Sequence, residues 1–236
     1  MATFTGVTAP IYEELAHSDK HILIAGATGS GKSTIMNGMI NSLLYDPVNE
    51  QALVLCDVKM VEFSRYENTK HCLRLATSPE EVEATLRGVL DMIAYRLQDM
   101  KNRGLKIYDK TRVNLFIDEL ADLVLTSKKA TNMLQRICQI GRAAGVKVVC
   151  ATQCPLASVI PTRIKVNFNI VIGLHTQNKQ HSRNILDETG CEELPMFGEA
   201  LIMYPTTGIK RTKIPLISEE QLDKIAEWDR KRGENG

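Results

Sequence analysis

The hydrophobic residues of this 236-residue chain fall into two alternating patterns. Short apolar runs are typical of buried strands, whereas apolar residues spaced three or four apart are typical of one buried helix face. Strands are predicted at 21–25, 52–56, 113–117, 146–150, 170–174 and 200–204. Helices are predicted at 34–44, 78–104 and 130–144, and from residue 218 onward. Strands linked by helices predict an α/β fold, with a mostly parallel sheet and helices on both of its faces.

The predicted helix that follows residue 78 has the clearest boundaries. Ser78 is a suitable N-cap, Pro79 fits the first helical position, and Glu81 completes a capping box. Gly104 suits the C-terminal stop, because glycine adopts the left-handed conformation that often ends a helix.

Composition excludes several classes of protein. Hydrophobic residues make up 44% of the chain and the net charge is +1, so no overall basic field indicates a nucleic-acid partner. No apolar run approaches the 20 or so residues that span a bilayer, and residues 1–10 do not resemble a signal peptide. The six cysteines show no CxxC pair and are expected to be reduced, which favours a cytoplasmic location.

The most informative motif follows the first predicted strand. Its sequence, Gly-Ala-Thr-Gly-Ser-Gly-Lys-Ser, is a complete G-x-x-x-x-G-K-[ST] phosphate loop at the start of a predicted helix. Backbone N–H groups at such a helix start attract phosphate. The residues predicted to bind the nucleotide are Gly26, Ala27, Thr28, Gly29, Ser30, Gly31, Lys32, Ser33 and Thr34. The motif predicts ATP as ligand, with Lys32 reaching the β- and γ-phosphates and Ser33 ligating Mg²⁺.

Three further motifs end predicted strands. Asp118 is the predicted second Mg²⁺ ligand, and Glu119 the general base that activates water, although a solvated helix cap is the alternative for Glu119. Gln153 is predicted to contact the γ-phosphate or the water, or else to be an ordinary polar strand end. Asp57 ends the strand at 52–56. Because ligands bind at the carboxyl ends of parallel strands, all four motifs are expected at one edge.

Taken together, these motifs resemble the FtsK/SpoIIIE DNA translocases. The resemblance rests on the phosphate loop, Ile117-Asp118-Glu119-Leu120-Ala121-Asp122-Leu123, Gly141-Arg142-Ala143-Ala144-Gly145, Ala151-Thr152-Gln153 and Ser182-Arg183-Asn184-Ile185-Leu186-Asp187. The segment Asp57-Val58-Lys59 resembles the family's Asp-Pro-Lys, with valine in place of proline. The motifs lie in the family's order and cover roughly residues 10–205.

The resemblance implies a RecA-like P-loop NTPase and ATP hydrolysis coupled to movement of double-stranded DNA through a homo-oligomeric ring, a hexamer. A membrane segment and the winged-helix domain that often accompanies this motor are not expected in this sequence, which suggests a mobile genetic element. The arginine that such proteins supply to a neighbour's ATP corresponds here to Val171. Arg163 and Arg183 are the predicted substitutes, and Arg142 is either an interface residue or a salt-bridge partner.

The expected organisation is a lead-in segment at 1–20, the motor domain at 21–217, and a C-terminal helix with a frayed tail at 218–236. The basic stretch at 101–112 is a candidate DNA contact, although basic residues at a helix C-terminus are also favoured by the helix dipole.

Two other functions stay open. One is a related ATPase that powers protein secretion, and the other is an ATP-switched DNA-binding or recruitment module that does not translocate.

Overall fold

The computed structural model describes residues 9–46 and 51–234. Its strands are β1 (Ile22–Ala25), β2 (Ala52–Cys56), β3 (Cys72–Ala76), β4 (Val113–Ile117), β5 (Val146–Thr152), β6 (Ile170–Gly173), β7 (Glu199–Tyr204) and β8 (Gly208–Lys213). Its helices are α1 (Pro10–His17), α2 (Lys32–Tyr45), α3 (Pro79–Arg103), α4 (Leu120–Thr126), α5 (Lys128–Ile140), α6 (Thr162–Lys165), α7 (Lys179–Leu186) and α8 (Glu219–Glu234), with 3₁₀ turns η1 (Ser64–Tyr66) and η2 (Cys191–Glu193). Every predicted strand is present, and β3 and β8 are additional.

The strands form one sheet in the order β3-β2-β4-β5-β1-β6-β7-β8. The pairs from β3 to β6 are parallel, whereas β6–β7 and β7–β8 are antiparallel. Strand β5 therefore lies between β1, which precedes the phosphate loop, and β4, which precedes Asp118. This order places the end of β5 between the two principal motifs.

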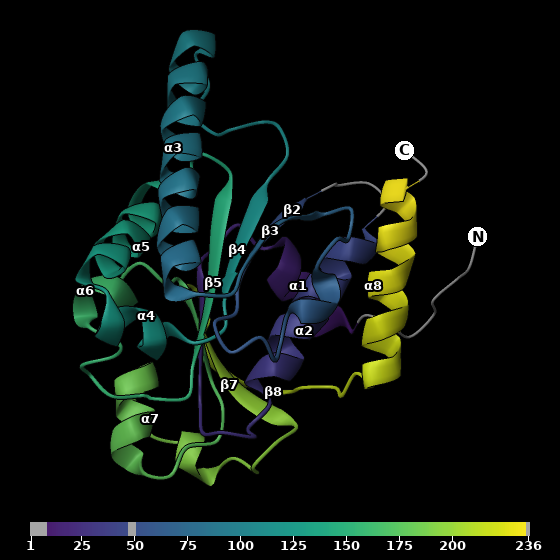
Figure 1. Cartoon of the computed structure of the whole chain (residues 1–236). Coiled ribbons are helices and arrows are strands. Elements are labelled where there is room, and N and C mark those ends of the chain that lie inside the picture. The colour runs from purple at the N-terminus through teal and green to yellow at the C-terminus, as the bar shows by residue number, and fades with distance from the viewer. Residues whose placement is uncertain (1–8, 47–50, 235–236) are drawn as a thin grey trace.

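Helices cover both faces of the sheet, as predicted (Figure 1). Helices α3, α4 and α5 lie on one face, and α1, α2 and α8 lie on the other. Each face has its own apolar core. Leu86 and Ile93 of α3 belong to the first core, and Met39 and Leu43 of α2 to the second. Alternate residues of the central strands point into the two cores, which is why these strands are apolar throughout.

Helix α3 has the predicted boundaries. The Ser78 side chain accepts a hydrogen bond from the Glu81 backbone N–H, and Gly104 at the C-terminal end is left-handed with φ 67°. Helix α5 is shorter than predicted, because it ends at Ile140 and a turn over 141–145 leads into β5. A β-carbon on Gly141 would lie 2.6 Å from the carbonyl oxygen of Ile137, so the chain is tightly packed there.

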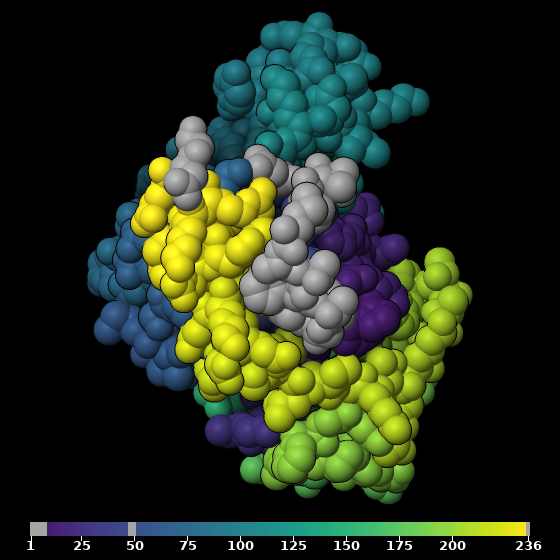
Figure 2. Space-filling view, turned by 90° about the vertical axis from the view of Figure 1, so that its right-hand side faces the viewer, coloured from purple at the N-terminus to yellow at the C-terminus, as the bar shows by residue number. Residues whose placement is uncertain are grey.

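The C-terminal helix α8 packs against α2 and the turn η1. Figure 2 shows α8, in yellow, lying across one side of the molecule. Its Asp229 is fully buried and its Oδ1 lies 2.6 Å from Nδ1 of the buried His71. The sequence predicted fraying from Lys231, but α8 continues to Glu234, and residues 235–236 lie outside the described part. Of the predicted lead-in, residues 1–8 also lie outside it, whereas Tyr12 and Leu15 of α1 are buried in the second core.

Two buried polar residues at the amino edge of the sheet, His21 and Lys147, have hydrogen-bond partners. His21 accepts a hydrogen bond at Nδ1 from the Val148 backbone N–H, and its Nε2 lies 3.0 Å from the Cys138 carbonyl oxygen. Burial lowers the pKa of His21 to about 4, so its imidazole is neutral. Lys147 donates to the carbonyls of Leu15 and Ala16, which end α1. Burial lowers the pKa of Lys147 to about 7.

Candidate nucleotide site

The four predicted motifs meet at the carboxyl edge of the parallel strands. The phosphate loop follows β1, Asp57 follows β2, Asp118 and Glu119 follow β4, and Gln153 follows β5. Because β5 separates β1 from β4, Gln153 lies between the phosphate loop and the carboxylate pair. The sequence-based prediction of a shared edge is confirmed by this topology.

Glycine is required at three positions of the phosphate loop. Gly29 and Gly31 have φ of 78° and 98°, a backbone region that side chains strongly disfavour. Gly31 is also the N-cap of α2, so the first N–H groups of that helix point into the loop. A β-carbon on Gly26 would lie only 2.7 Å from Cβ of Leu174. The loop is thus a preformed cradle of backbone N–H groups.

Two polar side chains of the loop, those of Lys32 and Ser30, have hydrogen-bonding capacity that a ligand can use. Lys32 folds back so that its Nζ donates to the carbonyls of Gly26 and Ala27, at 3.0 and 2.8 Å. Burial lowers the pKa of Lys32, and the nearby carboxylates of Glu119 and Asp118 oppose this shift. The Ser30 hydroxyl oxygen is buried and has no hydrogen-bond partner within the described residues. Both groups can turn to an anion in the cradle.

A chain of hydrogen bonds connects the loop to Glu119. The Thr28 hydroxyl donates to Oε1 of Gln153 at 2.6 Å. The backbone N–H of Gln153 donates in turn to Oε2 of Glu119 at 3.2 Å. Oε1 of Glu119 accepts from the Ala121 backbone N–H, so Glu119 also caps α4. The predicted alternative of a solvated cap is therefore half correct: Glu119 is a cap, but it is buried, with 8% of its surface exposed.

Asp118 lies in an acidic environment. Burial raises its pKa to about 7, with further contributions from Glu62, Asp57 and Glu119. Asp57 is fully buried, and its Oδ1 has no hydrogen-bond partner within the described residues. A buried carboxyl group whose pKa is raised by burial and by neighbouring carboxylates marks a candidate functional site.

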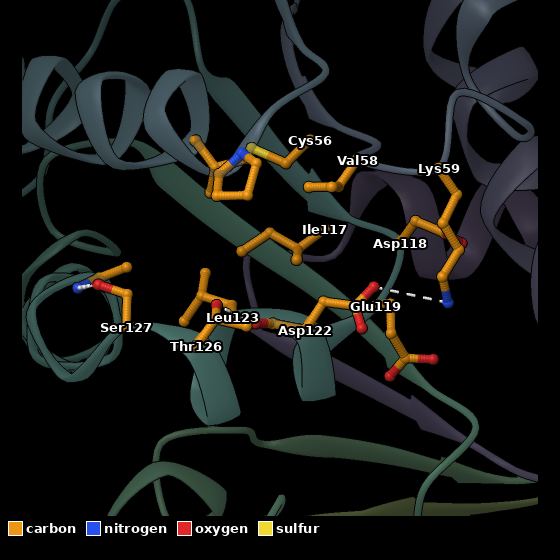
Figure 3. Close-up of a pocket in the computed structure, with 13 residues that line it drawn as sticks. Cys56, Val58, Lys59, Ile117, Asp118, Glu119, Asp122, Leu123, Thr126 and Ser127 are labelled. Atoms are coloured by element: carbon orange, nitrogen blue, oxygen red, sulfur yellow. Dashed lines mark hydrogen bonds and ion pairs between the residues drawn. The ribbon is translucent and has the colours of Figure 1, made fainter.

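A cavity of about 170 Å³ opens beside this cluster (Figure 3). Its floor is apolar and includes Val82, Ile117 and Leu123. Its charged wall is formed by Lys59, Asp118, Glu119 and Asp122, which come from the turn after β2 and from the β4–α4 connection. In Figure 3 the Lys59 ammonium points toward Asp122, at 3.5 Å from its Oδ2.

These residues fit a nucleoside triphosphate with Mg²⁺. Loop N–H groups, Lys32 and the unpartnered Ser30 hydroxyl match a triphosphate, while Ser33 and Asp118 supply oxygen ligands. No group of three or more His, Cys, Asp or Glu side chains within 9–46 and 51–234 is arranged to hold a metal. Mg²⁺ usually takes only one or two carboxylates and completes its shell with phosphate and water.

The candidate arginines lie apart from this cluster. Val171 is buried in β6, so it has no surface role. Arg163 on α6 and Arg183 on α7 are exposed, and their side chains have no ion pair among the described residues. Arg142 forms a salt bridge with Asp19 at 2.9 Å, the alternative that the sequence analysis gave for it. An unpaired, exposed arginine is free to reach a second copy of the chain.

The basic stretch at 101–112 lies far from the phosphate loop. It begins in the last turn of α3 and leads into β4 at the amino edge of the sheet, where it projects from the molecule (Figure 2). Arg103 is engaged by Asp99 and Asp109. A DNA contact in this stretch stays a prediction.

Sequence reasoning missed two features of the site. The first is the bond from Thr28 to Gln153, and the second is the ion pair between Lys59 and Asp122. Position x of the phosphate-loop motif carries no chemical requirement, so nothing in the sequence singled out the Thr28 hydroxyl. Lys59 was noted only as part of the Asp-Val-Lys segment, and its partner depends on how β2 and β4 pair.

The fold and the phosphate loop together define a P-loop ATPase fold. The conjugation coupling protein TcpA of pCW3, in its monomer form with ATPγS, matches with a TM-score of 0.79 at 23% identity, over 89% of this chain and 65% of that one. The Type VII secretion ATPase EccC of Thermomonospora curvata, represented by its cytoplasmic domain, matches with a TM-score of 0.75 at 22% identity, over 89% and 28%. At these identities the likeness shows the fold alone.

Sequence comparison identifies the family. Residues 3–115 match the FtsK/SpoIIIE family. The DNA translocase FtsK of Rickettsia typhi is 33% identical over 264 residues, covering 93% of this chain and 36% of the relative. The chain belongs to the FtsK/SpoIIIE family, and it spans about a third of that relative's length. Within the described residues, no helix has the length and apolar character needed to cross a membrane.

Proposed function

We propose that the chain hydrolyses ATP and uses the energy to move double-stranded DNA, working as a ring-shaped homo-oligomer, a hexamer. The observation that carries the proposal is the hydrogen-bond chain from Thr28 through Gln153 to Glu119, which ties the phosphate loop to a buried carboxylate. Family membership and the name of the Rickettsia typhi relative support DNA as the substrate. The six free cysteines fit the reducing cytoplasm.

Each residue has a defined task in this function. When bound, MgATP supplies the transferable γ-phosphoryl group and the positive charge of the metal. Lys32 and the loop N–H groups would bind phosphate oxygens, and Ser33 and Asp118 would hold the metal. A carboxylate oxygen of Glu119 accepts a proton from the attacking water. Gln153 is placed between Glu119 and the phosphate loop, where its amide can respond to the γ-phosphate.

The site needs a cation from a neighbouring subunit. Arg163 and Arg183 are the candidates, because both are exposed and unpaired among the described residues. We expect that replacing the acting arginine by alanine lowers the turnover number by about 10³-fold or more. Mixing that variant with an inactive Lys32→Ala variant should restore part of the ATPase activity, since one interface then contains both intact halves. Full activity of both arginine variants would exclude both residues.

Two rival functions make different predictions. A protein-secretion ATPase would be stimulated by a polypeptide rather than by DNA. An ATP-switched binding module would not require a base, so the buried, doubly hydrogen-bonded Glu119 argues against it.

Displacement of a third strand from a DNA triplex tests translocation directly. We expect ATP-dependent displacement by the wild type and none by Lys32→Ala. ATP hydrolysis without displacement, and without stimulation by DNA, would contradict the proposal. Stimulation by a polypeptide in its place would favour the secretion ATPase.

A further inference from the structure

The turn that follows β2 is held rigidly by a buried side chain. Oδ2 of Asp57 accepts hydrogen bonds from the backbone N–H groups of Glu62 and Phe63, both at 2.8 Å. The Met60 N–H donates to the Asp57 carbonyl, and Met60 has φ of 52°. Phe63 is fully buried and fixes the end of the turn in the core. The four residues between Asp57 and Glu62 therefore have one defined conformation.

This turn presents Lys59 to the nucleotide site. Lys59 Nζ lies 3.5 Å from Oδ2 of Asp122, in the first turn of α4 just after Glu119 (Figure 3). Both side chains are 43% exposed. An ion pair this exposed contributes little to stability, because water and salt screen it. Stability alone therefore does not account for the orientation of Lys59.

The charges around Lys59 are unbalanced. Within the described part of the site, two groups are positively charged, the ammonium groups of Lys32 and Lys59, and five are carboxyl groups. The carboxyl groups belong to Asp57, Glu62, Asp118, Glu119 and Asp122. Such an excess of negative charge repels a triphosphate, and each cation at the site offsets part of that repulsion.

We propose that Lys59 is a second phosphate-attracting residue, whose ammonium group offsets the acidic cluster and thereby allows a nucleoside triphosphate to bind beside Asp118 and Glu119. Asp122 orients it from α4. This inference rests on the proposed function. Lys59 lines the same cavity as Asp118 and Glu119, which places its ammonium group beside the site.

The dependence of nucleotide affinity on salt tests this role. The probe is a fluorescent ATPγS analogue with Mg²⁺, titrated into variants of the 236-residue chain. Lys59→Met should weaken binding about tenfold at an ionic strength of about 0.02 M and less than about threefold at about 0.5 M, since salt screens the interaction. Lys59→Arg should restore the affinity. Lys101→Met is the matched control, because Lys101 is exposed at the far end of α3.

The Asp122→Asn variant distinguishes an electrostatic role of Lys59 from a purely structural role of its ion pair with Asp122. If Lys59 acts through its charge, removing the Asp122 carboxylate should tighten nucleotide binding about twofold. Weaker binding by both Asp122→Asn and Lys59→Met would mean that the ion pair is merely structural, and would overturn the inference. The thermal unfolding midpoint identifies a misfolded variant, and Lys59→Gln provides a second neutral substitution.

The outcomes also separate this inference from the proposed function. Failure of the wild type to bind the analogue would overturn the proposed function and the inference with it. Normal binding by the wild type, with the same affinity and salt dependence in Lys59→Met and Lys59→Gln, would overturn the inference alone.

Discussion

The two edges of the sheet differ in how their buried polar groups are paired, although Nε2 of His71 at the amino end of β3 has no partner among the described residues. At the amino edge, both ring nitrogens of His21 have partners, and Lys147 and Arg96 each donate to two carbonyls. At the carboxyl edge, the Ser30 hydroxyl and Oδ1 of Asp57 are buried without partners among the described residues. The buried polar groups named at the amino edge therefore stabilise the fold, whereas those at the carboxyl edge have hydrogen-bonding capacity that remains available to a ligand.

The largest effect is expected at the carboxyl edge. Glu119→Gln should lower the turnover number by about 10³-fold, because an amide cannot take a proton from water. Nucleotide affinity should change little, whereas the free energy of unfolding should fall by about 1–2 kcal/mol, because the amide oxygen can accept only one of the two N–H hydrogen bonds that Glu119 accepts. Steady-state ATPase assays and nucleotide titrations measure the two quantities. Near-normal turnover would show that Glu119 is not the base.

His21 provides the corresponding pH test at the amino edge. Its pKa is about 4 in the fold and about 6.5 when unfolded, so the unfolded state binds the proton first. Stability is therefore complete above pH 6.5 and is lost as the pH falls toward 4, by about 3 kcal/mol. Urea unfolding of the wild type and of His21→Asn should diverge over this range, because asparagine does not titrate. Parallel pH profiles would contradict this account.

A substitution of Arg96 tests, at constant pH, how much the hydrogen bonds at the amino edge contribute to stability. Its guanidinium donates to the carbonyls of Ala144 and Thr111 and lies 4.4 Å from the centre of the Tyr108 ring. Arg96→Met leaves both carbonyls without this donor and should lower the free energy of unfolding by about 2–3 kcal/mol. The ATPase rate per folded molecule should be unchanged. A loss of activity at full stability would show that the two edges are coupled.

The smallest effect is expected at Thr28. Thr28→Val removes the hydroxyl that holds the Gln153 side chain, so the turnover number should fall about tenfold while nucleotide affinity stays within about twofold. Thr28→Ser keeps the hydroxyl and should retain most of the activity. Equal turnover in Thr28→Val and the wild type would mean that this bond does not position Gln153.

The sequence predicted the carboxyl edge better than the outer parts of the fold. The phosphate loop and the strand ends carry residue types that their chemistry requires, so their positions could be read directly. Strand β3 was missed because its exposed Leu73 and Arg74 break the apolar pattern of a buried strand. Strand β8 was missed for a similar reason, since its three basic residues are exposed at the sheet edge.

Long-range pairing was beyond what the sequence could predict. Lys59–Asp122 and Thr28–Gln153 depend on the order of the strands, which hydrophobic periodicity does not specify. The same holds for His71 and Asp229, which are 158 residues apart. Nothing in the sequence pairs these two residues, and the structure buries both side chains together.

The ATPase rate as a function of protein concentration, with and without long double-stranded DNA, tests the central claim most directly. The account predicts a rate that rises steeply with concentration and rises again with DNA, because active sites shared between subunits form on assembly. A slow rate that is independent of both would contradict a DNA-driven ring.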